Sequence, residues 1–436
     1  MGYQDGAGKS TGAGARRAVK ERVAIIGTGV AGLGSAWQLR DRADITLIEK
    51  QARPGGHSNT VTVEEDGMPV RIDTGFIVFN HATYPNLVRL FEELGVRTKP
   101  SEMSFSVCHQ PLGIEFNGMG LSKVFAQRRN IVRPRFYALL FQILRFFRLA
   151  RAALNDPSTA QLTLREFADR HRLGRDFLDL YLVPMSSAVW STEPGRVLDF
   201  PALSLIRFFE NHGFLGITTH HPWFTVEGGA KTYVDKIIAA VGPVRLPAKV
   251  VSVAEAPRSV TITIEGGETK DFDRVIIAAH ADEALKMLAA PDADQKRLLG
   301  AFGYQRNVAT LHTDARVMPD RRRAWAAWNY RVEGKSPVAT THYWMNALQG
   351  VSKRRDYFVS INGTIAEDRI LYQADYEHPV FTLAAMNAQA SLPTLNTRSP
   401  GQRIFFCGSY FRHGFHEDAY GSAVDLANVL RPILAA

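Results

Sequence analysis

The sequence predicts an α/β protein in which a Rossmann-like nucleotide-binding domain is interrupted by an inserted α+β domain. Three observations lead to this prediction. Residues 21–50 alternate strand, glycine-rich turn, helix and strand; residues 81–220 change to helical periodicity; and a strand followed by a helix returns late in the chain, from Ile404 onward. A chain of 436 residues with 45% apolar content is long enough to bury two such cores.

The first glycine-rich turn lies between the first predicted strand and the first predicted helix. The sequence VAIIGTGVAG at 23–32 is followed by a helical stretch to about Arg40. In this pattern Gly27 permits a tight turn, Gly29 lets the backbone approach a pyrophosphate, and Gly32 allows close packing of helix on sheet. The free N–H groups at the start of the helix then face the phosphates. The stretch therefore predicts a dinucleotide site.

An acidic residue ends the second predicted strand, which covers residues 45–48. Glu49 follows Gly27 by 22 residues, near the roughly 20-residue spacing at which a carboxylate accepts hydrogen bonds from an adenosine ribose. An acid at this position favours an unphosphorylated ribose, and therefore FAD or NAD over NADP. With strand, helix, strand and acid in register, the motif is more specific than GxGxxG alone.

A second glycine-rich turn, ARPGGHSNT at 52–60, follows Glu49 closely. A plain NAD dehydrogenase is expected to place another helix soon after its second strand. This chain instead continues through two short strand-like runs, at 61–63 and 69–72, into DTGF at 73–76. The order of these segments therefore differs from the order expected in an NAD dehydrogenase.

Together these motifs resemble the FAD-dependent amine oxidase and phytoene desaturase superfamily, whose pattern is GxGxxG, an acid, RxGGxxxT and a later DxG segment. The resemblance implies an FAD-binding domain of the glutathione-reductase/amine-oxidase type, with FAD held non-covalently. It places the turn from Arg53 to Ser58 along the pyrophosphate and flavin, and Thr74 and Gly75 near the isoalloxazine ring. One departure is His57, where amine oxidases usually carry Arg. Nucleotide-sugar mutases of similar fold often have GGHS there.

Later segments resemble the remaining parts of the same nucleotide domain. They are WFTVEGGA at 223–230, short strands at 244–246 and 250–253, a buried strand at 273–280, and a closing strand and helix. The closing helix is expected to begin near Ala419 with its N–H groups facing a flavin carbonyl. The predicted FAD contacts are Gly27, Gly29, Val30, Ala31, Gly32, Glu49, Lys50, Arg53, Gly55, Gly56, His57, Ser58, Thr74, Gly75, Phe76, Val250, Ala279, Gly408, Ser409, Asp418, Ala419 and Ala423.

The rest of the chain is expected to form the substrate domain. Helical periodicity recurs at 84–94, 136–154, 164–171 and 203–210, and residues 300–390 mix strands with aromatic loops. The predicted FAD-binding domain comprises residues 21–80, 222–295 and 395–436, and the predicted substrate domain comprises residues 81–221 and 296–394. Residues 1–20 are rich in Gly, Ala and small polar residues and are predicted to be disordered.

Residues 121–155 form a basic and aromatic stretch within the predicted substrate domain. The basic residues are Lys123, Arg128, Arg129, Arg133, Arg135, Arg145, Arg148 and Arg151, and the rings include Phe125, Phe136, Tyr137, Phe141, Phe146 and Phe147. Two interpretations stay open. The stretch is either an ordinary core-facing helix whose arginines reach out to water, or an amphipathic segment that lies on an anionic membrane surface.

The candidate proton acceptors near the predicted flavin are His57, His416, Glu417 and Asp418. A flavin accepts a hydride, and the protein must position the C–H bond and supply any base. Asp418 is more simply explained as a cap or first-turn acid of the last helix. His416 and Glu417 are therefore the predicted catalytic residues. No metal site is expected, because Cys108 and Cys407 lie far apart and outside any CxxC motif.

A closer resemblance comes from strings in both predicted domains. IDTGFIVFN, TYPNL, MSFSV, VPMSSAVWST and GFHEDAYGSA are similar to a bacterial group of flavoproteins that resemble desaturases of methyl-branched fatty-acyl phospholipids in furan fatty acid formation. This resemblance implies hydride removal beside a methyl-substituted double bond, proton loss to His416 or Glu417, and a conjugated diene as product. The alternatives are a flavin amine oxidase or carotenoid-type desaturase, a non-redox flavin mutase, and a non-catalytic FAD-binding membrane partner.

Charge and composition narrow the range of partners. The formal charge of +9 comes mainly from arginine, but nothing in the sequence resembles a nucleic-acid module. The expected substrate is a lipid or another apolar small molecule, and the electron acceptor is either O₂ or a carrier. The sequence shows no secretory signal pattern and no apolar run long enough to span a membrane. We expect a cytoplasmic protein, peripheral on the inner face of the membrane if residues 121–155 bind lipid.

Overall fold

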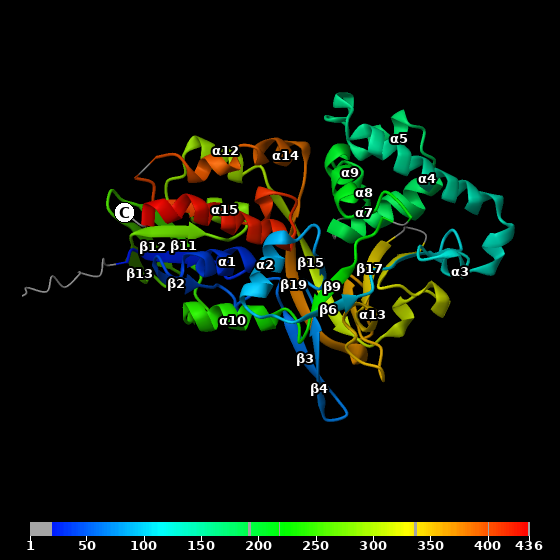
Figure 1. Cartoon of the computed structure of the whole chain (residues 1–436), viewed down its shortest axis with the longest axis horizontal. Coiled ribbons are helices and arrows are strands. Elements are labelled where there is room, and N and C mark those ends of the chain that lie inside the picture. The colour runs from blue at the N-terminus through cyan, green and yellow to red at the C-terminus, as the bar shows by residue number, and fades with distance from the viewer. Residues whose placement is uncertain (1–19, 191–192, 218, 335–337, 400, 435–436) are drawn as a thin grey trace, which may run out of the picture.

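The computed structural model describes residues 20–190, 193–217, 219–334, 338–399 and 401–434. Apart from Lys20, the tail predicted to be disordered lies outside the described residues. Figure 1 shows an elongated molecule with a sheet and its helices at one end. Helices α4 (Pro134–Ala153) and α9 (Ala202–Asn211) lie at the other end, and the long strands β15 (Gly303–His312) and β19 (Ile370–Val380) run between the two ends.

A five-stranded parallel sheet, in the order β10-β2-β1-β14-β20, organises the first end. Its strands are β1 (Arg22–Ile26), β2 (Asp44–Ile48), β10 (Val244–Arg245), β14 (Arg274–Ile277) and β20 (Ile404–Phe406). In the central strands β1 and β14, residues 23–26 and 275–277 are apolar runs whose side chains are buried, as expected for a parallel sheet covered on both faces. Segments far apart in the sequence join this one sheet, and the predicted α/β class is confirmed.

Three helices pack together on this sheet: α1 (Val30–Leu39), α10 (Lys231–Val241) and α15 (His416–Leu434). The contact of α1 with α15 is close, since a Cβ added at Gly34 would lie 2.6 Å from the ring of Tyr420. The expectation that the last helix begins near Ala419 was wrong by three residues. Asp418 accepts a hydrogen bond from the backbone of Phe415, and this interaction starts the helix at His416.

A seven-stranded mixed sheet, in the order β19-β15-β18-β17-β16-β7-β8, forms the middle of the molecule. Its remaining strands are β7 (Phe105–His109), β8 (Ile114–Asn117), β16 (Trp328–Glu333), β17 (Val338–Trp344) and β18 (Phe358–Ile361). Strand β7 pairs in parallel with β16, so the two segments predicted as substrate domain meet in one sheet. The mostly helical prediction for residues 81–220 missed β7 and β8, because such short strands carry little periodic signal.

Smaller elements surround these two sheets. The small strands are β3 (Thr60–Glu65), β4 (Met68–Asp73), β5 (Phe79–Asn80), β6 (Thr98–Ser101), β9 (Trp223–Val226), β11 (Val250–Glu255), β12 (Val260–Ile264) and β13 (Thr269–Phe272). The additional helices are α2 (Pro85–Glu93), α11 (Ala281–Met287), α12 (Ala293–Leu299), α13 (Met345–Gln349) and α14 (Leu383–Gln389). Strands β5, β9 and β6 form one sheet, and β11, β12 and β13 form another.

A helical lobe forms the second end of the molecule (Figure 1). Besides α4 and α9 it contains α3 (Leu121–Val124), α5 (Leu164–Arg170), α6 (Arg175–Phe177), the π-helical turn η3 (Leu178–Leu182), α7 (Val183–Trp190) and α8 (Pro194–Val197). Helix α4 buries Phe136, Leu139 and Phe146, and it also leaves the apolar side chains of Phe141 and Leu144 exposed. Among the described helices, none is long and apolar enough to cross a membrane.

Candidate active site

One large cavity connects the carboxyl end of the parallel sheet with the helical lobe. Its volume is about 1680 Å³. Pockets for a single small ligand usually measure about 300–1,000 Å³. The cavity therefore has room for a dinucleotide and a second molecule. Its lining begins at the turn after β1 and ends among the side chains of α4, η3 and α7.

The turn after β1 forms a cradle at one end of the cavity. Gly27 has a φ of +96°, which favours glycine, and a Cβ added at Gly32 would lie 1.9 Å from the Gly27 carbonyl oxygen. In contrast, a Cβ added at Gly29 would meet no atom within 4 Å. Helix α1 has no side-chain cap at Gly29, so its first N–H groups are free to bind an anion. The cradle thus has open space where a pyrophosphate would lie.

Glu49 is buried beside this cradle and is held in one orientation. One carboxylate oxygen accepts hydrogen bonds from the Thr28 backbone nitrogen at 2.9 Å and from the Thr28 hydroxyl at 2.6 Å. The other oxygen accepts a hydrogen bond from the backbone of Gln51 at 2.9 Å. Glu49 also lines the cavity. The carboxylate therefore fixes the glycine turn and stands where a ribose hydroxyl could reach it.

The second glycine-rich turn packs directly on the first. The Gly55 backbone nitrogen donates to the Thr28 carbonyl at 3.0 Å, and a Cβ added at Gly56 would lie 3.1 Å from the Gly29 Cα. Arg53 donates to the Gly56 carbonyl at 2.8 Å and lines the cavity. Two turns that are separate in the sequence therefore form one wall of the nucleotide end.

The DTGF segment closes on the second turn at the middle of the cavity. The Phe76 backbone nitrogen donates to the His57 carbonyl at 2.8 Å, and a Cβ added at Gly75 would lie 2.2 Å from the same oxygen. No side chain larger than glycine fits at position 75. His57, Gly75 and Phe76 consequently line the cavity side by side.

His416 begins α15 and lines the cavity where the nucleotide end meets the apolar end. Its Nε2 lies 2.7 Å from the Tyr233 hydroxyl and 3.3 Å from the Ser58 hydroxyl. Its ring stacks on Phe76 with centroids 3.9 Å apart and planes 9° apart. Burial lowers the pKa of His416 from 6.5 to about 3. The imidazole is therefore neutral near pH 7 and rigidly oriented.

Glu417 and Asp418 point away from the large cavity, since neither is among its lining residues. The Glu417 carboxylate accepts hydrogen bonds from the Asn86 backbone at 3.0 Å, the Asn86 side chain at 2.8 Å and the Leu87 backbone at 2.9 Å. These donors belong to the first turn of α2. Asp418 accepts from Phe415 at 2.9 Å. Both acids stabilise helix starts, and both line a smaller, separate cavity of about 480 Å³ instead of the large one.

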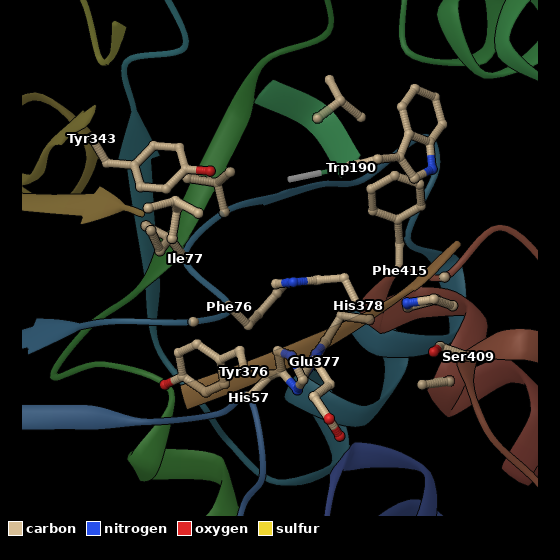
Figure 2. Close-up of a pocket in the computed structure, with 18 of the residues that line it drawn as sticks. His57, Phe76, Ile77, Trp190, Tyr343, Tyr376, Glu377, His378, Ser409 and Phe415 are labelled. Atoms are coloured by element: carbon tan, nitrogen blue, oxygen red, sulfur yellow. The ribbon is translucent and has the colours of Figure 1, made fainter. Parts of the chain in front are cut away.

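Two histidines and a tyrosine line the cavity beside the DTGF segment (Figure 2). The ring of His57 stacks on Tyr376 at 4.7 Å and meets His378 edge-on at 5.2 Å. Nδ1 of His378 lies 2.8 Å from the amide nitrogen of Asn307. Burial lowers the pKa of His378 to about 4 and holds the pKa of His57 well below its usual range. Within the described part of the chain, Nε2 of His57 is buried and has no hydrogen-bond partner.

The other arm of the cavity is walled by uncharged side chains. In Figure 2, Ile77 and Tyr343 lie on one side of an open space and Trp190 and Phe415 on the other. Trp190 and Phe415 have centroids 5.8 Å apart. Between positions 74 and 223, the residues that line the cavity include no Asp, Glu, Lys or Arg. Burial also lowers the pKa of His212, in this wall, to about 4 and lowers the pKa of His220, so the described lining residues of this range are uncharged side chains and histidines whose neutral form burial favours.

With this geometry established, the chain can be compared with known proteins. Residues 30–431 match the model of the family described as flavin containing amine oxidoreductase. The chain belongs to this family. Members of the family bind FAD. A search of curated proteins found no match to this chain.

Solved structures of the same fold include several oxidoreductases and an isomerase. Cyclohexylamine oxidase from Brevibacterium oxydans IH-35A is 16% identical with a TM-score of 0.67, covering 94% of this chain and 100% of that one. The CLA-producing fatty acid isomerase from P. acnes is 13% identical with a TM-score of 0.65, covering 94% and 98%. Putrescine oxidase bound to putrescine is 16% identical with a TM-score of 0.65, covering 96% and 100%. At these identities the likeness shows the fold alone.

The residues of the nucleotide end fit the FAD that the family binds. The open space at Gly29 and the uncapped start of α1 suit a pyrophosphate, and Glu49 suits a ribose. The predicted FAD contacts that line the cavity are Gly27, Gly29, Val30, Ala31, Glu49, Lys50, Arg53, Gly56, His57, Thr74, Gly75, Phe76, Val250, Ala279, Gly408, Ser409 and Ala419. The predicted contacts that do not line it are Gly32, Gly55, Ser58, Asp418 and Ala423.

Several residues that line the site were not predicted from the sequence. Trp190, Phe208 and Phe415 form an aromatic wall, and the rings of Phe208 and Phe415 stack at 4.7 Å. Tyr376 and His378 reach the cavity from β19. Phe415 directly precedes His416, a predicted site residue, and this adjacency could have identified Phe415 as part of the site. The sequence carried no comparable signal for Tyr376 or His378, because the residue pattern of an interior strand does not indicate which cavity a side chain faces.

Proposed function

We propose that this member of the family is an FAD-dependent dehydrogenase that desaturates the acyl chain of a lipid. The substrate we expect is a methyl-branched unsaturated fatty-acyl chain of a phospholipid. One observation carries the proposal: the arm of the cavity that leads away from the FAD-binding end is apolar and uncharged. The closer sequence resemblance to fatty-acyl phospholipid desaturases agrees with it.

The free energy of transfer favours an acyl chain over a polyamine in this arm. Each CH₂ group moved from water into an apolar site contributes roughly 0.8 kcal/mol. An ammonium group would lose its hydration, and the cavity-lining residues between positions 74 and 223 include no carboxylate to compensate. A fatty acid isomerase and amine oxidases share this fold, so the fold is compatible with either substrate class and the choice rests on the wall of the arm. These points support a lipid over an amine substrate.

Bound FAD supplies hydride acceptance, and the residues of this chain provide orientation and proton removal. Ile77, Tyr343, Trp190 and Phe415 border the space in which the acyl chain would lie and exclude water from it. Loss of a hydride and then of a neighbouring proton from the substrate converts a methyl-branched alkene into a conjugated diene. The electron pair removed from the substrate finally passes to O₂ or to a carrier.

Of the two predicted proton acceptors, His416 is the one that lines the cavity. Its low pKa makes it a weak base. A weak base is sufficient here, because a proton next to an allylic cation is strongly acidic. Tyr233 and Ser58 hold Nε2 of the ring, and we propose that Nδ1 receives the proton. We further propose that FAD is held non-covalently.

The test is anaerobic reduction of the purified yellow protein by a panel of methylated phospholipids, carotenoids and polyamines, followed by mass spectrometry of the products. We expect methylated phospholipid to bleach the flavin and to lose two hydrogen atoms. Bleaching by amines or carotenoids alone would replace the proposal with an amine oxidase or a carotenoid-type desaturase. Turnover that needs reduced flavin without net electron transfer would indicate a mutase. No bleaching by any compound would indicate a non-catalytic FAD-binding partner.

A further inference from the structure

The helical lobe carries an unusual exposed apolar surface. Most of the exposed large apolar side chains in the described part of the chain gather here, and we call them the lobe patch: Met119, Leu121, Ile131, Val132, Tyr137, Phe141, Leu144 and Ile217. Leu121 is 78% exposed, Val132 is 80% exposed and Phe141 is 68% exposed. Apolar clusters of this kind on a protein surface mark a binding site for another apolar surface.

The lobe patch surrounds the mouth of the cavity. Met119, Leu121, Leu144 and Ile217 are exposed to solvent and also line the cavity. Inside these four residues the wall continues with apolar side chains such as Ile143 and Phe147. An uncharged and mostly apolar lining therefore leads from the outer surface toward the FAD-binding end.

Positive charge is concentrated around the same mouth. Residues 116–155 contain eight Lys or Arg residues and no Asp or Glu, a formal charge of +8 in a chain whose net charge is +9. Arg128, in the 3-10 turn η1 (Arg128–Val132), and Arg148, on α4, are exposed. Within the described residues neither one forms an ion pair. They differ from Lys123, Arg135 and Arg151, which form ion pairs with Glu102, Asp176 and Glu210 respectively.

We propose that the lobe patch docks on an anionic lipid bilayer. The apolar side chains enter the boundary between headgroups and acyl chains, and the arginines bind lipid phosphates. Docking would place the cavity mouth against the acyl chains, so that the substrate enters without crossing water. The inference extends the proposed function and rests on it for the identity of the lipid that is taken up.

A second copy of the chain fits this surface poorly. Self-association through the lobe patch would bring two acid-free segments of formal charge +8 together, and like charges repel. The absence of a membrane-spanning helix among the described residues is consistent with peripheral binding. An anionic bilayer matches both the charge and the apolar character of the surface.

The test is flotation of the FAD-loaded, full-length protein with vesicles of phosphatidylcholine alone or mixed with phosphatidylglycerol. We expect the protein to float with the mixed vesicles and much less with phosphatidylcholine. Neutralising two cations with Arg128→Gln and Arg148→Gln should lower the partition coefficient by on the order of 20- to 30-fold. The pair Val132→Ser and Phe141→Ser, whose side chains are exposed and do not line the cavity, should lower it on both kinds of vesicle.

Matched controls lie on other elements of the molecule, away from the helical lobe (Figure 1). Arg258→Gln with Lys296→Gln removes two exposed cations, and Met68→Ser removes a side chain that is 66% exposed. These variants should float like the wild type. Thermal melting and bound FAD absorbance should be unchanged in every variant. Wild-type flotation in the Arg128/Arg148 and Val132/Phe141 variants, or no flotation of the wild type itself, would overturn the proposal.

The same preparation separates this proposal from the proposed function. Detergent-dispersed methylated phospholipid should still bleach the flavin in the docking variants, because the cavity interior is intact. Flotation without bleaching by any lipid would keep the docking surface and reject the desaturase function. Bleaching by dispersed lipid without flotation would reject the docking surface and keep the function.

Discussion

The Glu49 carboxylate accepts hydrogen bonds from both the backbone nitrogen and the hydroxyl of Thr28, at 2.9 and 2.6 Å. The acid at the end of β2 therefore holds the glycine turn that follows β1.

Replacing Glu49 with Ala should lower the free energy of unfolding of the apoprotein by about 1.5–3 kcal/mol and weaken FAD binding. Chemical denaturation and FAD titration measure the two effects. Thr28→Val is the matched variant: it removes one donor and should weaken FAD binding less. Unchanged FAD affinity in Glu49→Ala would contradict the assignment to the ribose.

Two glycines of the first turn should respond in opposite ways to the same substitution. Gly29→Ala adds a methyl group to open space, so the apoprotein should melt as the wild type does while FAD binding is lost. Gly32→Ala places a methyl group 1.9 Å from a backbone oxygen, so the apoprotein itself should be destabilised. Thermal melting without FAD and fluorescence titration with FAD distinguish the two. Full FAD affinity in a folded Gly29→Ala protein would show that the pyrophosphate lies elsewhere.

His416 and Glu417 are neighbours in the sequence but should behave differently as variants. His416→Ala should keep FAD and lose most of its turnover on methylated lipid, because its ring lines the cavity. Glu417→Gln should retain turnover and lose about 1–3 kcal/mol of stability, because the carboxylate accepts three hydrogen bonds from the start of α2. Single-turnover flavin reduction measures the effect of each variant on turnover, and denaturant unfolding measures its effect on stability. Full turnover in FAD-loaded His416→Ala would exclude this proton acceptor.

His342 should make the fold sensitive to acid. Its Nδ1 lies 2.6 Å from the Ser360 hydroxyl, and burial lowers its pKa from 6.5 to about 3. Between these two values the unfolded chain binds more protons than the folded one, so stability is complete above pH 6.5 and decreases as the pH falls toward 3. The free energy of unfolding falls by about 1.4 kcal/mol per pH unit where the unfolded chain binds one more proton at this histidine than the folded chain does.

The variant His342→Gln should flatten the stability profile between pH 6.5 and 5. Asp73 opposes the trend in both proteins, since burial raises its pKa to about 6 and it therefore gains stability as the pH falls. Its contribution cancels when the two profiles are subtracted. Equal slopes in the wild type and the variant would show that His342 is not protonated on unfolding in this range.

Local spacing in the sequence was enough to predict the nucleotide end of the molecule. The tight turn at Gly27, the apolar strand before it and Glu49 after the second strand act over short distances along the chain, and backbone geometry constrains each of them. Strand β1, helix α1 and strand β2 consequently lie close to their predicted positions. The family match supports the resemblance drawn from the same motifs.

Tertiary packing alone decided the rest of the site. The sequence by itself determined that FAD-type motifs are present, because their spacing is a property of the local backbone. It could not determine that Glu417 turns toward α2 while His416 faces the cavity, since one residue along a helix rotates the side chain by about 100°. Nor could it show that β19 brings Tyr376 beside His57. That contact depends on strand pairing between distant segments, which the seven-stranded sheet establishes.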